Sequence, residues 1–248
     1  MQNVRRRLAS RGSLVFSVTL WCGLAAGCTG LNSLSSLNSL TASRAGLAGS
    51  EQRMQAEACR ATGEQLAAVE RDEQAIAQML RARQLNPEIR GTAHPLAVLY
   101  DRQRMLDAAE REYREALREL PRSADVRNDY GYFLYSRGDY SGSESQLRAA
   151  LKLRPDHPQA RLNLALALAG QGRHEESFGE FERAVGRASA HYNTAVLLLR
   201  GGEVERGMGQ LRLALQEDPG LEAARLLLEA PVVQGMETGS AAVAVMNP

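Results

Sequence analysis

Side chains that could catalyse a reaction or hold a metal are few and scattered in this sequence. No second histidine or cysteine stands at metal-ligand spacing from any of the four histidines, His94, His157, His174 and His191. Glu175 and Glu176 follow His174, but acids in the first turn of a helix favour its dipole and face solvent. No phosphate loop, dinucleotide fingerprint or nucleophile elbow is present. We therefore expect no enzyme, metal or cofactor; the alternative is an enzyme with an unrecognised site.

The three cysteines do not form a disulfide framework. Cys22 lies in an apolar run near the N-terminus, Cys28 follows small residues, and Cys59 stands alone further along the chain. Without a histidine close to it in the sequence, Cys59 has no evident activating base. A lone thiol on a helix is more often a small core residue than a reactive group, so a core position is favoured for Cys59.

The first 27 residues have the features of an export signal. Four arginines within residues 5–11 precede the apolar run "LVFSVTLWCGLAA", which is too short for a membrane span. The following "LAAGC" resembles the bacterial lipobox, with Ala25 where leucine is commonest. This resemblance implies that residues 1–27 are a signal peptide and that Cys28 is acylated, with palmitate for example, and so binds the membrane. Thr29 in place of aspartate implies the periplasmic side of the outer membrane. An ordinary signal peptide is the alternative.

The composition predicts that the exported part is a mildly acidic, helical protein. The full chain has a net charge of +1, and removal of residues 1–27 leaves 26 basic against 29 acidic residues. This balance gives no electrostatic footprint for nucleic-acid binding. Residues 28–51 include the low-complexity stretch "LNSLSSLNSLTAS". They are interpreted as a flexible tether, with a marginal helix as the alternative.

A period of 34 residues organises the middle of the chain. Prolines recur at Pro87, Pro121 and Pro155, each preceded by an alanine five residues earlier. A larger apolar residue stands three positions before each alanine, and a small residue four positions before that. The three sets are Ala75, Met79 and Ala82; Ala109, Tyr113 and Ala116; and Ser143, Leu147 and Ala150. The spacing predicts apolar helix faces, and the small residues suit close helix crossings.

This pattern resembles the tetratricopeptide repeat, a helix–turn–helix unit of about 34 residues. The resemblance implies an all-α, right-handed superhelical solenoid over residues 52–230. Its five units span 56–89, 90–123, 124–157, 158–187 and 188–221, with a capping helix at 222–230. The fourth unit is four residues short, so its last turn must be tightened. Thr194 is a polar departure at a packing position. Residues 231–248 have no repeat signature and are predicted to be disordered.

The tripeptide Arg137-Gly138-Asp139 suggests cell adhesion, but the period favours a turn. Gly138, Gly172 and Gly202 occupy the same place, between the two helices of a unit. Glycine ends a helix there by reaching a left-handed conformation at low cost, and Asp139 is expected to cap the second helix. The turn therefore accounts for the glycine without an adhesion function.

The first helices of such units line a concave groove in which relatives bind peptides. The predicted groove residues are His94, Val98, Arg102, Asn128, Tyr132, Tyr135, Ser136, Tyr192, Val196 and Arg200. The alternative for several of these positions, as for Leu162 and Leu166, is packing against the next unit.

The layout is similar to lipoproteins that assist assembly of type IV or tight-adherence pili. It implies a non-catalytic scaffold that binds other envelope proteins, without nucleic acid or a small-molecule substrate. A self-associating structural spacer is the alternative.

Overall fold

The structure, a computed structural model, describes residues 33–230, with side chains from residue 47 onward. The chain divides into two compact units, residues 1–48 and 49–248, and the account below concerns the second. The described residues form α-helices and no strand, which confirms the all-α prediction. No helix among them is long and apolar enough to cross a membrane. The predicted signal peptide, Cys28 and the tail after Ala230 lie outside the described residues.

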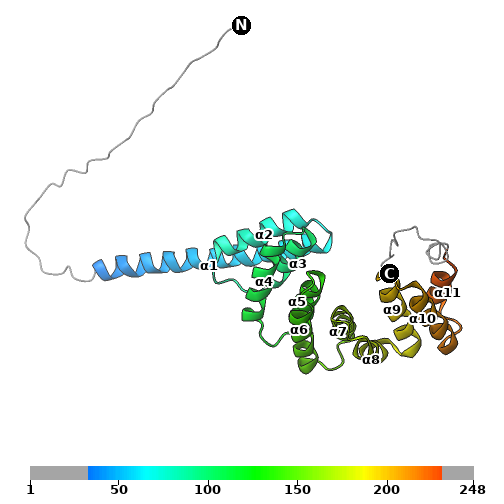
Figure 1. Ribbon diagram of the computed structural model, residues 1–248. Coiled ribbons are helices and arrows are strands. Elements are labelled where there is room, and N and C mark those ends of the chain that lie inside the picture. The colour runs from blue at the N-terminus through cyan, green and yellow to red at the C-terminus, as the bar shows by residue number, and fades with distance from the viewer. Residues whose placement is uncertain (1–32, 231–248) are drawn as a thin grey trace, which may run out of the picture. The chain divides into compact units, whose positions relative to one another are not determined.

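The helices pair into consecutive hairpins along the chain (Figure 1). From α3 to α10 the contacts within each hairpin are the most extensive, and successive hairpins then pack against one another. The helices are α1 (Ser33–Ala68), α2 (Asp72–Leu85), α3 (Ala93–Arg102), α4 (Leu106–Glu119), α5 (Ala124–Ser136), α6 (Tyr140–Leu153), α7 (Pro158–Gly170), α8 (His174–Val185), α9 (Arg187–Arg200), α10 (Val204–Glu217) and α11 (Glu222–Glu229).

The first helix differs from its sequence interpretation. Residues 33–51 of the predicted flexible tether belong to α1, which continues without a break to Ala68. The stretch contains no proline, and its leucine and alanine residues are good helix formers, so the helix runs through its serines and through Gly46 and Gly49. From Ala56 onward α1 carries residues of the solenoid core: Ala56 is fully buried beside Ala82 and Ile89, and the partly exposed Cys59 packs against them.

Close helix crossings hold each hairpin together, as the small residues predicted. Ala82, Ala116 and Ala150 are fully buried, and the larger residues Met79, Tyr113 and Leu147 are at most 3% exposed. In the third hairpin the helices approach so closely that a Cβ placed on Gly131 would lie 2.6 Å from Cγ of Leu147. Small side chains at these positions are therefore a steric requirement.

The turn inside each hairpin has one residue with a positive φ. Gly138, Gly172 and Gly202 adopt φ values of +80°, +76° and +81°, while Glu70 and Arg104 take the same place with φ of +59°. Asp139 caps α6 by accepting a hydrogen bond of 2.9 Å from the amide of Gly142. The prediction that Arg137-Gly138-Asp139 forms a turn is confirmed.

Polar contacts connect neighbouring hairpins across the stack. The guanidinium of Arg83 on α2 donates to both carboxylate oxygens of Glu112 on α4, at 2.8 and 2.6 Å. Between α7 and α5, the amide of Asn163 donates to Oδ1 of Asn128 at 2.9 Å. Both asparagines are buried, at 2% and 6% exposed. Since a buried polar group is costly when unpaired, this bond fixes the register of the two helices.

Replacement of Asn163 tests this contact. In Asn163→Ala the Oδ1 atom of Asn128 loses its donor inside the core, and the free energy of unfolding is expected to fall by about 1–3 kcal/mol. The matched control is Gln216→Ala on α10, which removes an exposed amide side chain away from this contact and should cost no more than about 0.5 kcal/mol. Equal urea midpoints for the two variants would show that the asparagine pair does not stabilise the stack.

Two glycine-to-alanine changes separate steric crowding from helix propensity. Gly131 and Gly209 both lie inside helices, but a Cβ on Gly209 would meet nothing within 4 Å. Gly209→Ala should raise the free energy of unfolding by about 0.5–1 kcal/mol. In Gly131→Ala the contact with Leu147 should offset that gain by about 1–3 kcal/mol. Thermal denaturation of both variants checks this, and a stabilised Gly131→Ala would contradict the close crossing.

Candidate functional site

One connection between hairpins is much shorter than the others. Residues 86–92, 120–123 and 154–157 join successive hairpins elsewhere, whereas Gly186 alone separates α8 from α9. Gly186 has φ of +82° and ψ of 169°, a region that is accessible essentially to glycine only. The predicted tightening of the fourth unit is thus achieved by a single glycine.

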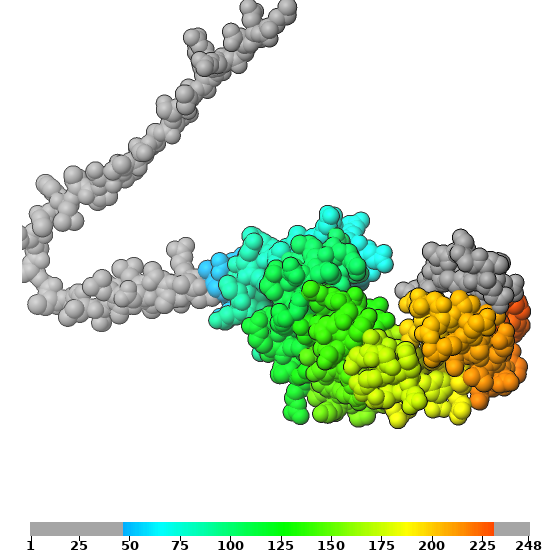
Figure 2. Space-filling view, viewed as in Figure 1, coloured from blue at the N-terminus to red at the C-terminus, as the bar shows by residue number. Residues whose placement is uncertain are grey.

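The short connection changes how the helices stack. Helix α5 packs directly against α7, whereas the main neighbours of α9 are α8 and α10. In the space-filling view the surface of α7 and α8 lies between those of α5–α6 and α9–α10 (Figure 2). A pocket of about 330 Å³ is present here, lined by residues of α5–α9 and of the turns beside them.

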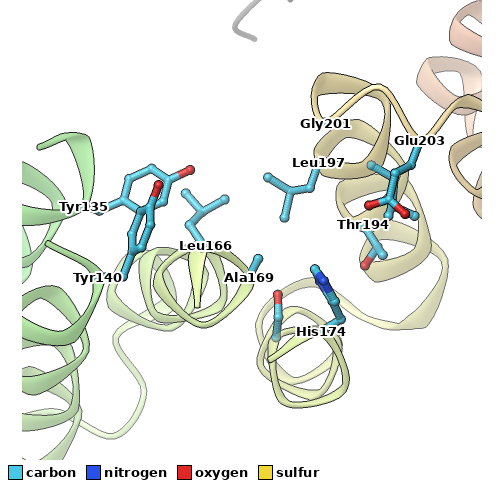
Figure 3. A pocket seen from close by; sticks show the side chains of 12 residues that line it. Tyr135, Tyr140, Leu166, Ala169, His174, Thr194, Leu197, Gly201 and Glu203 are labelled. Atoms are coloured by element: carbon cyan, nitrogen blue, oxygen red, sulfur yellow. The ribbon is translucent and has the colours of Figure 1, made fainter. Parts of the chain in front are cut away.

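Two tyrosines form one wall of this pocket (Figure 3). The ring centroids of Tyr135 and Tyr140 are 5.8 Å apart, and Tyr132 continues the row at 6.1 Å from Tyr135. Tyr140 lies against the end of α7, where a Cβ on Gly170 would come within 2.6 Å of its ring. Burial, and then the neighbouring Tyr140, raises the pKa of Tyr135. The hydroxyl of Tyr135 is therefore neutral.

The opposite wall comes from α9 and its following turn, and the floor from α7 and α8 (Figure 3). Leu197 faces the tyrosines, with Leu166 on the floor between them. Both leucines line the pocket and pack on the buried cluster around Phe181. We call this space, between Tyr135 and Tyr140 on one side and Leu197 on the other, the aromatic pocket.

Polar groups stand around the apolar interior of the aromatic pocket. His174, Thr194 and Glu203 contribute to its lining. The Oγ1 atom of Thr194 is buried without a hydrogen-bond partner. Glu203 forms an ion pair with Arg206 in the next turn of the helix, so its charge is partly balanced. The polar departure of Thr194 from the repeat pattern thus falls at the pocket.

The predicted groove residues lie in different environments. Tyr132 is 46% exposed, and Ser136 and Arg200 are also exposed. Arg102 pairs with Asp72, and Nε2 of His94 lies 2.8 Å from a carboxylate oxygen of Asp129. Val98, Tyr192 and Val196 are half-buried, and the first two pack against core clusters. Asn128 is buried in its bond with Asn163, so its amide is used inside the protein.

Of the predicted groove residues, only Tyr135 lines the aromatic pocket. Sequence reasoning missed Tyr140, Leu197 and Glu203 as pocket residues. A usable signal was the four-residue deficit of the fourth unit, because a missing turn changes the distance between neighbouring first helices.

The histidines and acids do not converge on a catalytic centre. No group of three or more histidine, cysteine, aspartate or glutamate side chains in the described residues could hold a metal ion. His157 caps α7 at its N-terminus, with Nδ1 3.4 Å from the amide of Ala160. Nδ1 of His191 lies 2.7 Å from Oε1 of Gln210. Glu175 and Glu176 lie exposed in the first turn of α8, as predicted.

Known proteins with the same repeats resemble this chain. A model of the tetratricopeptide repeat family matches residues 95–146 and 134–189. A "TPR repeat-containing thioredoxin" of Arabidopsis thaliana, TTL4, is 36% identical over 101 residues. That match covers 39% of this chain and spans 15% of the relative's length.

Solved structures share the fold at low sequence identity. PilW, described as a widely conserved type IV pilus biogenesis factor, matches 74% of this chain and 90% of its own at a TM-score of 0.56 and 20% identity. PilF of Pseudomonas aeruginosa matches 76% and 91% at 0.53 and 22% identity. YrrB, "a TPR protein with an unusual peptide-binding site", matches 69% and 91% at 0.54 and 20% identity. At these identities the likeness shows the fold alone. Residues 95–189 thus match the tetratricopeptide repeat model, and the chain folds, over its described part, as an all-α solenoid of helix hairpins.

Proposed function

We propose that this protein is a non-catalytic scaffold, anchored by lipid in the bacterial envelope, that binds peptide segments of other envelope proteins in its groove. The observation that carries the proposal is the row of tyrosines on α5 and α6, which begins at the half-exposed Tyr132 and ends in the aromatic pocket. Tyrosine is enriched at binding interfaces because it offers a large apolar area together with a hydroxyl.

A role in assembling a pilus or secretion complex is part of the proposal. Its support is the sequence layout of a lipobox followed by repeats, and a fold shared with proteins described as pilus biogenesis factors. Peptide binding on a repeat solenoid fits the general behaviour of such folds, whose stacked units form extended surfaces for partners.

Photo-crosslinking in living cells tests the scaffold. A photoreactive residue at Tyr132 is expected to capture one dominant envelope protein. The control position is Arg148 on α6, whose side chain is also 46% exposed, and it should not capture that protein. Identical products from both positions, or no product from Tyr132, would contradict binding in the groove. Capture of the protein itself alone would favour a self-associating spacer.

Replacement of the lipobox cysteine tests the anchor. Cys28→Ser should abolish labelling by a fatty-acid analogue and release the protein from membranes, because the thiol is the expected acylation site. Cys59→Ser is the matched control and should keep full labelling, since Cys59 packs against the solenoid core. Unchanged labelling of Cys28→Ser would overturn the proposed anchoring.

A further inference from the structure

We propose that the aromatic pocket takes a neutral aromatic side chain, presented on an extended segment of a partner protein. This inference rests on the proposed peptide binding and specifies its chemistry. It would make Tyr135, Tyr140 and Leu197 the residues that select the partner.

The size of the pocket suits one ring. A dry protein cavity of about 150 Å³ already binds benzene. The aromatic pocket, at about 330 Å³, has room for a phenol or an indole together with part of its backbone. A long aliphatic side chain would leave much of this width unfilled, because its chain is narrower than a ring.

The walls of the pocket favour a ring over an aliphatic group. Tyr132, Tyr135 and Tyr140 follow one another with centroids 6.1 and 5.8 Å apart, and aromatic rings attract one another at separations of about 4.5–7 Å. A guest ring between Tyr140 and Leu197 would extend this row by one member. Its other face would then pack against the leucine methyl groups.

The charges around the pocket favour a neutral guest. Glu203, which could attract a cation, is already paired with Arg206. Arg200, exposed on α9, acts on the hydroxyl of Tyr135 with its positive charge. A lysine or arginine side chain in the pocket would therefore meet a compensated carboxylate on one side and a like charge near the other. An acidic guest would lose its hydration among Leu166, Ala169 and Leu197.

The guest must come from another protein rather than from the segments outside the described residues. Residues 231–248 contain no phenylalanine, tyrosine or tryptophan, and residues 1–32 contain only Phe16 and Trp21. Both of these lie in the segment that is predicted to be removed on export. Residues 231–248, and residues 28–32 after the predicted signal peptide, therefore offer no ring, and the proposal assigns the guest to a partner protein.

A host–guest peptide series tests the proposal. The probes are Ac-Ser-Ala-Xaa-Ala-Ser-amide peptides in which Xaa is Trp, Phe, Leu, Lys or Ala, titrated into the full-length protein and followed by calorimetry and NMR. The Trp and Phe peptides are expected to bind at least tenfold more tightly than the other three. Ring currents from the guest should shift the methyl resonances of Leu197. Equal affinity for Leu and Trp, or the tightest binding by Lys, would overturn the proposal.

A pair of alanine-to-phenylalanine variants locates the binding. Ala169→Phe places a ring of the protein itself in the pocket and should weaken binding of the Trp peptide at least tenfold without lowering Tm. Ala223→Phe, at an exposed position on α11, is the control and should leave binding unchanged. Binding that survives in Ala169→Phe would place the ring elsewhere and overturn the assignment.

The two proposals can fail separately. If crosslinking from Tyr132 captures a partner but none of the peptides binds at millimolar concentration, the scaffold stands and the aromatic specificity is wrong. If the Trp peptide binds at the pocket but crosslinking captures nothing, the pocket chemistry stands and the proposed scaffold function is wrong.

Discussion

The structure depends on how closely two helices can approach within one hairpin. Where α5 crosses α6, glycine is present because Leu147 occupies the space that a Cβ would need. Alanine or glycine takes the corresponding place in the other hairpins, at Gly63, Ala97, Ala165 and Ala195. Because the two helices of each hairpin approach closely, successive hairpins can pack against one another in a stack. The stacking of the hairpins and the placing of the tyrosines follow from this short-range steric rule.

Features that arise inside one repeat could be predicted from the sequence. Met79, Tyr113 and Leu147 could be placed in the core because the periodic apolar face is a property of a single helix, although each also packs against the first helix of the next hairpin. The left-handed conformation of Gly138 and the cap by Asp139 are also local consequences of turn chemistry. The predictions succeeded where the cause and the effect lie within a few residues of each other.

Features that depend on the relation between repeats could not be predicted in the same way. The bond between Asn128 and Asn163 requires the rotation from one hairpin to the next, which no residue pattern states. Tyr140 lines the pocket only because Gly170, on another hairpin, leaves room for its ring. The extent of α1 was missed for another reason: its leucine-rich stretch has helix propensity but little amphipathic pattern, so composition favoured a tether.

The single-residue link at Gly186 shows that a repeat protein can gain a cavity by losing part of its chain. The cavity walls need no unusual residue types: tyrosine, leucine and alanine occur throughout the stack. What differs is the length of one loop, and with it the spacing of the hairpins on either side. Evolution could therefore open, close or resize such a site through insertions and deletions in a surface loop, while the helices that carry the fold stay under their own packing constraints.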